Sequence, residues 1–305
     1  MLTNAVEIAL FNKPLALFVE LFTNLKPPTC MNNDFRNLVQ RDPNTGYYEY
    51  NSSLVLKQEY DQYTTEDHKV WQILYDRQME QLPGKATADY ITGIKTVKFE
   101  REHIPNFEAV NEILQNITGW RVHVVPGLIP NREFFELMRS RNFCATTWLR
   151  TMEQLDYLVE PDMFHDVFGH VPLLTNQPLC DFLVDLSDIA LKYLDSEVAI
   201  ECVARLYWYT VEFGLIQEAE GLRIYGAGIL SSSGETNYSL YSEAPKRLPY
   251  DVKTIINTPY IKDRYQEQYF VINSYEQLYS SVSEIDRCIA EAVELEKAGK
   301  SPIEM

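Results

Sequence analysis

Hydrophobic periodicity along the chain predicts a mostly helical protein. From residue 64 to 82 apolar side chains recur on one helical face, among them Val70, Trp71 and Leu74. Residues 120–126 instead alternate apolar and polar positions, as a short half-buried strand does. The same periodicities predict helices over residues 64–82, 110–117, 131–138, 179–194, 197–218 and 285–298, and strands over residues 120–126, 223–228 and 268–272.

These predictions describe a predominantly α fold with a few short β-strands. Strands and helices do not alternate in the way that builds a large parallel sheet. Neither GxGxxG nor GxxxxGK[ST] occurs, so a dinucleotide fold and a P-loop are not supported. Residues 26–63 are polar and turn-rich. Before them, residues 14–22 predict a short helix that opens at Pro14 and docks its apolar face on the body.

Composition narrows the classes of partner. The 305 residues include 27 Lys and Arg against 44 Asp and Glu, a formal net charge of −17. That balance argues against nucleic acid, which requires a basic surface. No apolar run reaches the roughly 18 residues of a membrane span. Five widely spaced cysteines without a CxxC motif predict neither a disulfide framework nor a thiolate zinc site, and they favour a reducing, cytoplasmic compartment.

Two of the five histidines, His165 and His170, lie five residues apart. On a regular helix this spacing leaves them about 140° apart, so they converge only if the helix breaks, as Gly169 allows. Asp162 and Asp166 are near enough in sequence to accept an N–H from an imidazole, as carboxylates beside metal-bound histidines do. The alternative is a pair of unrelated structural histidines.

Glu212 offers a third ligand because it lies inside an apolar and aromatic run. A lone carboxylate buried there is costly and requires a cation or a hydrogen-bond network. A salt bridge to Arg205 or Arg223, or a position facing solvent, explains it equally well. Combined with the two histidines, it makes a set that suits non-haem Fe(II) and also catalytic zinc. An iron enzyme, a zinc-dependent hydrolase and a catalytically inactive metal-binding module therefore all remain open at this point.

Three segments resemble the signatures of the pterin-dependent aromatic amino acid hydroxylases: residues 161–174, 207–215 and 225–235. They occur in the family's order and spacing, and the resemblance, strongest to short bacterial members, covers roughly residues 60–285. It implies the aromatic amino acid hydroxylase catalytic-domain fold. We therefore predict an unassigned N-terminal arm over residues 1–60 and a catalytic domain over residues 61–305 that ends in a helix.

The resemblance also implies a reaction and its cofactors. The reaction is hydroxylation of the ring of L-phenylalanine to give L-tyrosine, with Fe(II), a tetrahydropterin and O2 as co-substrate. Iron is expected on His165, His170 and Glu212. The positions that match the family's pterin site are Val125, Gly127, Leu128, Ile129, Asn131, Phe134, Asp166, Ala204 and Tyr207. The positions that match its amino acid site are Arg150, Trp208 and Ser231.

Particular residues bear on the substrate. The planar guanidinium of Arg150 suits a carboxylate. Trp208 is typical of the phenylalanine and tyrosine hydroxylases, whereas tryptophan hydroxylases tend to have Phe there. Lys262 aligns with a position that is usually aliphatic in phenylalanine hydroxylases and acidic in tyrosine hydroxylases, so tyrosine or tryptophan hydroxylation remains an alternative. The chain ends after one helix, without the heptad-rich tetramerisation tail of the animal enzymes, and we expect a monomer or a small homo-oligomer.

Overall fold

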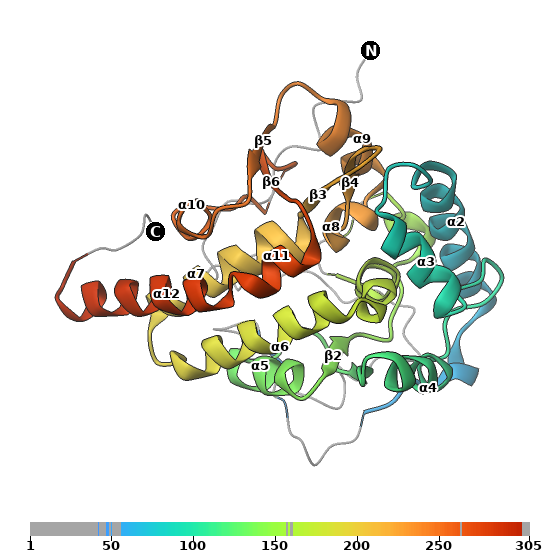
Figure 1. The fold of residues 1–305 in the computed structure, drawn as a ribbon. Helices are drawn as coiled ribbons and strands as arrows, with labels where there is room; N and C mark the ends of the chain where they lie inside the picture. Colours follow the sequence, from blue (N-terminus) through green and yellow to red (C-terminus); the bar gives the residue numbers. More distant parts are fainter. Residues whose placement is uncertain are drawn as a thin grey trace.

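The computed structural model describes residues 56–300 except 157, 159, 160 and 263, together with residues 42, 47, 48 and 50. Helices make up most of this part of the chain (Figure 1), which confirms the predicted fold class. The α-helices are α2 (Thr65–Gln81), α3 (Ala88–Thr96), α4 (Phe107–Ile117), α5 (Asn131–Arg139), α6 (Gln177–Lys192), α7 (Glu197–Tyr207), α8 (Ala227–Leu230), α9 (Ser233–Tyr241), α10 (Val252–Ile256), α11 (Tyr275–Ser280) and α12 (Val282–Lys297). Helix α6 packs against both α5 and α11, and α12 packs against α7.

The strands form two small sheets. Strands β1 (Arg121–Val124) and β2 (Asn142–Ala145) pair in parallel. The second sheet has the order β4-β3-β6-β5, in which only the β3–β4 pair is antiparallel. Its strands are β3 (Leu215–Glu218), β4 (Gly221–Ile224), β5 (Lys246–Pro249) and β6 (Gln268–Ile272).

Local sequence sets where several helices begin. Thr64 and Asp67 form a reciprocal capping box at the start of α2. The side chain of Asn106 accepts a hydrogen bond from a backbone N–H in the first turn of α4, and Ser196 does the same for α7. These caps satisfy amide groups that otherwise have no partner, so the predicted helices over 64–82 and 110–117 agree closely with α2 and α4.

The predicted helix over residues 197–218 is wrong at its C-terminal end. The α-helix stops at Tyr207, one π-helical turn (Trp208–Glu212) follows, and the last four residues form β3. A short apolar run fits a strand or a helix equally well, and here the pairing of β3 with β4 and β6 decides.

Other element predictions also require correction. Asn131 is the first residue of α5, and Pro130 occupies the N-cap position without a side-chain hydrogen bond. Strands β2 and β5 were not predicted because each has only four residues and depends on a partner far away in sequence. The predicted helix over residues 14–22 and Cys30 lie outside the described residues.

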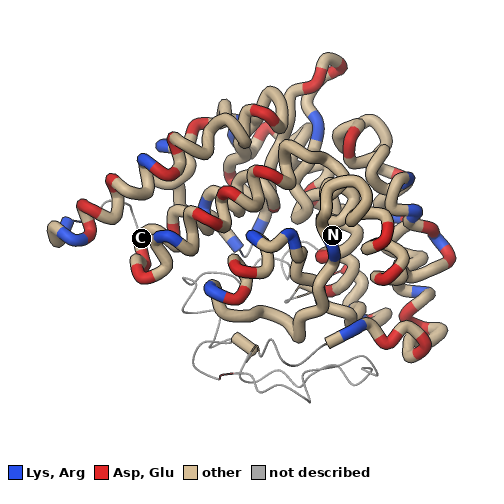
Figure 2. The backbone as a smooth tube through the Cα atoms, turned by 60° about the horizontal axis from the view of Figure 1, so that its bottom comes forward, with Lys and Arg blue, Asp and Glu red and all other residues tan. Residues whose placement is uncertain are grey.

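Two surface properties bear on partners. Within the described ranges, acidic residues are spread among the basic ones (Figure 2), in keeping with the net charge of −17. No described helix combines the length and the apolar character that crossing a membrane requires.

An aromatic cluster forms the core behind residues 164–170. Trp71 of α2 is fully buried and makes edge contacts with Phe164 and Phe168 at ring-centroid distances of 5.5 and 6.3 Å. Phe164 and Phe168 stack on each other at 4.6 Å, and Tyr90 of α3 donates a hydrogen bond to the carbonyl oxygen of Phe168 at 2.7 Å. These contacts hold one face of the segment in the core and leave its other face for polar side chains.

The segment continues into a short 3-10 helix, η6 (Val171–Thr175), against which α3 packs closely. Gly93 of α3 makes this approach possible, since a Cβ atom there would lie 2.1 Å from the carbonyl oxygen of Pro172. That distance is far inside a van der Waals contact, and the obstacle is rigid backbone. The close packing of α3 on η6 is therefore possible only because residue 93 has no side chain.

We expect Gly93→Ala to lower the free energy of unfolding by about 1–3 kcal/mol, because the added methyl group overpacks this contact. Thr92→Ala, at an exposed position of the same helix, is the matched control and should change stability by less than about 0.5 kcal/mol. Urea denaturation followed by circular dichroism measures both. Equal stability of the two variants would contradict the packing argument.

Candidate metal centre

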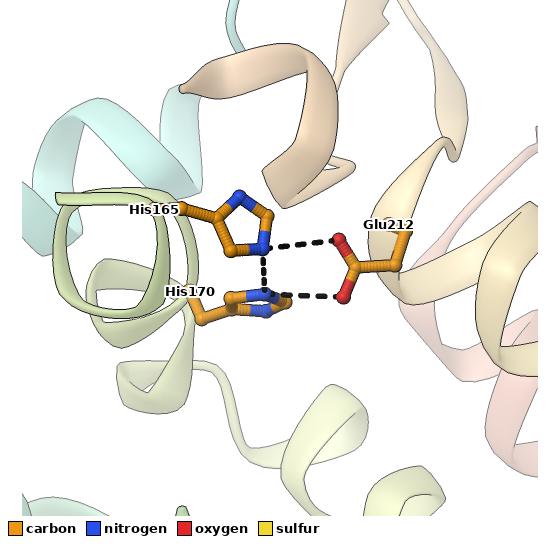
Figure 3. Close-up of side chains that lie close together, drawn as sticks. All are labelled: His165, His170 and Glu212. Carbon is orange, nitrogen blue, oxygen red and sulfur yellow. Dashed lines mark hydrogen bonds and ion pairs between the residues drawn. The ribbon is translucent and has the colours of Figure 1, made fainter. Parts of the chain in front are cut away.

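Three side chains meet in the interior of the molecule. His165, His170 and Glu212 each present a ligand atom, and these atoms all lie within 4.8 Å of one another (Figure 3). His170 Nε2 lies 3.2 Å from Glu212 Oε1, His165 Nε2 lies 3.5 Å from Glu212 Oε2, and the two Nε2 atoms are 3.3 Å apart. The two histidines point from one helical segment toward Glu212 on another, so the three sets of ligand atoms surround a common point.

The histidines converge without the predicted helix break. Residues Phe164–His170 form a π-helix, whose hydrogen bonds connect residues five positions apart. Residues at i and i+5 therefore lie one above the other, which brings the imidazoles of His165 and His170 to the same side. Gly169 remains inside the π-helix and does not end it. The predicted break was wrong because the roughly 140° separation of the two histidines holds for a regular α-helix and not for a π-helix.

Glu212 also lies at the end of a π-helix, Trp208–Glu212, and its side chain is 14% exposed. The alternative partners proposed from the sequence are engaged elsewhere. Arg205 contacts Glu201 at 2.8 Å, and Arg223 approaches Glu218 at 3.9 Å. Glu212 thus faces the two histidines and not an arginine, which is the arrangement expected of a metal ligand.

Electrostatics favour the forms that bind a cation. Burial lowers the pKa of His165 to about 4, so its ring is neutral at pH 7. Although burial opposes ionisation of Glu212, the neighbouring imidazoles of His170 and His165 lower its pKa below the ordinary value. The cluster therefore combines a carboxylate with at least one neutral imidazole lone pair, and a divalent cation would compensate the buried negative charge.

Ser231 orients the ring of His165. Ser231 Oγ donates to the carbonyl oxygen of Ala227 at 2.8 Å and lies 2.9 Å from His165 Nδ1. Since the hydroxyl hydrogen is used by Ala227, Nδ1 carries a hydrogen and the lone pair is on Nε2, facing the cluster. The prediction that Asp162 and Asp166 orient the imidazoles was wrong, because both carboxylates have other partners.

Asp162 instead binds Arg150. Its two oxygens accept hydrogen bonds from Nε and Nη2 of Arg150 at 2.9 Å, and a third from the Arg150 backbone N–H at 2.9 Å. The Asp162 side chain is fully buried, and that of Arg150 is 11% exposed. Despite burial, the guanidinium lowers the pKa of Asp162 below its usual value. The fork of Arg150 is thereby fixed in one orientation, with Nη1 3.5 Å from the Leu155 carbonyl oxygen.

Asp166 is anchored on the segment that follows β2. One of its oxygens accepts hydrogen bonds from the backbone N–H of Thr146 at 2.8 Å and from its hydroxyl at 2.9 Å. Burial raises the pKa of Asp166 to about 7. The sequence analysis did not identify Thr146, because 20 residues separate it from Asp166 and no local pattern connects them.

The predicted pterin-site residues come from three parts of the fold. Phe134 of α5 contacts Tyr207 of α7 edge to face, with ring centroids 6.1 Å apart. Asn131 lies one turn before Phe134, and Ala204 lies one turn before Tyr207, so each pair shares a helix face.

Residues 125–129 complete this region at the end of β1. The Val125 N–H donates to the carbonyl oxygen of Ala145 at 3.0 Å and so continues the β1–β2 ladder. Val125 and Ile129 are buried, whereas Leu128 is 37% exposed. Gly127 lies between them with a φ of 155°. The loop is thus held at its ends, and between them Leu128 is exposed while Gly127 is half-buried.

Trp208 begins the π-helix that carries Glu212, and its indole packs against Tyr260 at a centroid distance of 4.8 Å. Its Nε1 donates to Oε1 of Gln266 at 3.1 Å, while Nε2 of Gln266 donates to the carbonyl oxygen of Ile261. The backbone N–H of Gln266 donates to buried Glu235 at 3.3 Å. Sequence analysis missed Gln266 and Glu235, because the contacts join segments 31 to 58 residues apart.

Comparison with known proteins agrees with this site. Residues 45–297 match the family model of the biopterin-dependent aromatic amino acid hydroxylases. The chain is 48% identical over 226 residues to a phenylalanine-4-hydroxylase from Ralstonia nicotianae, covering 74% of this chain and 72% of the relative.

Solved structures are similar across most of the fold. Phenylalanine hydroxylase from Chromobacterium violaceum, with bound iron(III) and 7,8-dihydrobiopterin, matches at a TM-score of 0.78 and 40% identity, covering 92% of this chain and 95% of that one. The structure of the same enzyme with iron and phenylalanine matches at a TM-score of 0.73 and 42% identity, covering 80% of this chain and 90% of that one.

We expect Ser231→Ala to weaken Fe(II) binding by about 10- to 100-fold, because His165 loses the acceptor that fixes its tautomer and ring orientation. A chelator competition measures the dissociation constant, and Ser233→Ala, at an exposed position two residues away, is the control. Unchanged affinity in Ser231→Ala would show that the hydroxyl does not orient a ligand.

Glu235 gives a prediction for pH. Burial raises its pKa from 4.5 to about 7, so the folded protein binds this proton more tightly than the unfolded chain. Stability therefore falls as the pH rises from about 4.5 to 7, by up to roughly 3 kcal/mol. Glu235→Gln should remove this loss, making the variant more stable relative to wild type at pH 8 than at pH 5. Urea denaturation at both pH values tests it, with exposed Glu243→Gln as the control.

Proposed function

The chain belongs to the family of biopterin-dependent aromatic amino acid hydroxylases, and on that premise we propose that it is a phenylalanine 4-monooxygenase that hydroxylates the ring of L-phenylalanine to L-tyrosine. The observation that carries the proposal is the largely buried cluster of His165, His170 and Glu212. Its cofactors are Fe(II) and a tetrahydropterin, and O2 is the co-substrate.

The donor set fits iron. Two imidazoles and one carboxylate on one side of a cation leave its remaining coordination positions open, as non-haem Fe(II) oxygenases require. Tetrahydropterin and iron, when bound, supply the electrons and the activated oxygen for ring hydroxylation. The contribution of His165, His170 and Glu212 is to hold the metal, and none of them is required as a general base.

We propose that the pterin lies between α5, α7 and the loop after β1. Phe134 supports this placement because it offers an aromatic face to a flat heterocycle. Half-buried Gly127 and exposed Leu128 are proposed to present backbone groups to the edge of the ring. The remaining proposed contacts are Val125, Ile129, Asn131, Asp166, Ala204 and Tyr207.

The amino acid substrate is proposed to bind Arg150 through its carboxylate. The bidentate pair with Asp162 pre-orients the guanidinium, which reduces the entropy lost when the substrate is bound. Trp208 forms a wall of the ring pocket, and Ser231 lies between the substrate and His165. Each of these side chains positions the ring relative to the metal and excludes water.

Phenylalanine is proposed as the substrate because two relatives that are 48% and 45% identical to this chain are phenylalanine-4-hydroxylases. Lys262 is the departure within this region. Its ammonium lies 5.0 Å from the centroid of Tyr260, the ring that packs on Trp208, and burial lowers its pKa to about 8. Because this cation lies beside the proposed pocket wall, the assay compares phenylalanine with tyrosine and tryptophan as substrates.

We also propose one catalytic domain, a cytoplasmic location, and a monomer or small homo-oligomer. Buried, unpaired thiols at Cys180, Cys202 and Cys288 support a reducing compartment. The sequence places the N-terminal limit of the domain at residue 61, and we propose to extend it to about residue 45. The family model begins there, and Tyr48 is buried against the body.

The test is a turnover assay of the iron-loaded protein with tetrahydropterin and O2 on phenylalanine, tyrosine and tryptophan. We expect tyrosine to form from phenylalanine, with the highest kcat/KM of the three. His165→Ala should abolish turnover and lower the iron content. No tyrosine formation from phenylalanine would contradict the substrate, and bound zinc without pterin-dependent O2 uptake would favour a hydrolase over an oxygenase.

A further inference from the structure

A segment near the N-terminus docks on the loop that follows β1. Tyr48 is 5% exposed, and its backbone N–H donates to the carbonyl oxygen of Leu128 at 2.7 Å. Leu128 lies in the loop of residues 125–129, 80 positions further along the chain. The contact is a single backbone hydrogen bond to a loop residue that belongs to no helix or strand, so it holds the loop where regular secondary structure does not.

The ring of Tyr48 packs directly on Gly127. A Cβ atom at Gly127 would lie 2.7 Å from Cε2 and 2.9 Å from Cδ2 of Tyr48. Real side chains essentially never come so close, so the ring occupies the space that any other residue at position 127 would need. The bare Cα of Gly127 therefore makes room for the ring of Tyr48, whose nearest atoms are Cε2 and Cδ2.

Tyr50 fastens the same segment to β1. Its hydroxyl is hydrogen-bonded to His123 Nε2 at 2.8 Å, and the two rings meet edge to face at 6.1 Å. His123 lies on β1, directly before the loop, and is paired in register with Cys144 of β2. Tyr48 and Tyr50 thus contact both the tip of the loop and the strand from which it starts.

We propose that Tyr48 is a positioning residue for the pterin: its ring, packed on Gly127, holds residues 125–129 in the conformation that receives the heterocycle. The inference rests on the proposed function, which places the pterin at this loop. A loop already held in its bound conformation loses less entropy on binding than a free one. Removing the ring leaves Gly127, the residue with the greatest conformational freedom, without its packing partner.

Calorimetric titration of 7,8-dihydrobiopterin into the anaerobic, iron-loaded full chain tests this directly, without turnover. We expect Tyr48→Ala to raise the Kd about tenfold, while Tyr48→Phe, which keeps the ring, stays within about twofold of wild type. Tyr60→Ala is the matched control, because the Tyr60 hydroxyl bonds to Ile104 and not to the loop. Iron content and the midpoint of thermal unfolding identify variants that fail to fold.

A double-mutant cycle isolates the contact between the ring and the glycine. Gly127→Ala alone should weaken binding because its methyl group collides with Tyr48. The double variant with Tyr48→Ala should bind more tightly than the sum of the two single effects predicts, since the collision is removed. Strict additivity would show that the two residues act independently.

The outcomes separate this inference from the proposed function. Wild type that does not bind 7,8-dihydrobiopterin contradicts the proposed function itself. Wild type that binds it with the same Kd as Tyr48→Ala overturns only the role of Tyr48. Equal rises in the dihydrobiopterin Kd and in the KM for phenylalanine would also overturn that role, because they would indicate general loosening of the site.

Discussion

The fold depends on bringing two imidazoles and a carboxylate together in an apolar interior. Taking these groups out of water is unfavourable, and the structure compensates only when their ligand atoms converge on a cation or a complete hydrogen-bond network. His170 and Glu212 have side chains 6% and 14% exposed, so neither is satisfied by solvent. The surrounding helices hold the ligand atoms of these three groups within 4.8 Å of one another.

Two π-helical turns provide the convergence. A π-turn is less stable than an α-turn and persists only where the surroundings hold it. Around Phe164–His170 the support is aromatic: Trp71, Phe164 and Phe168 fill the space behind it, and α3 closes over the end through Gly93. Around Trp208–Glu212 the support comes from the residues that lead into β3. There the backbone N–H groups of Tyr225 and Gly226 both donate to the carbonyl oxygen of Gly214.

The supporting contacts of the site follow one physical pattern. Each functional side chain is held by a partner from a different segment: Ser231 for His165, Asp162 for Arg150, Thr146 for Asp166, and Gln266 for Trp208. Such contacts fix rotamers before any ligand arrives, which is how a protein contributes to chemistry that its cofactors perform. The loop of residues 125–129 belongs to the same pattern, with Tyr48 in the role of partner.

The sequence by itself determined the class of fold, the approximate limits of several of the longer helices and the three residues at the centre. Periodicity and capping residues are local, so α2 and α4 could be predicted from a few consecutive side chains, and the His-His-Glu set together with three motif segments pointed to the family. Only the tertiary structure decided how the histidines converge, which partners Asp162 and Asp166 take, where α7 gives way to β3, and that Tyr48 covers Gly127. The physical reason is range: these outcomes depend on contacts between residues separated by 12 to 80 positions or on packing that selects a π-turn, and the pattern of neighbouring residues does not encode either.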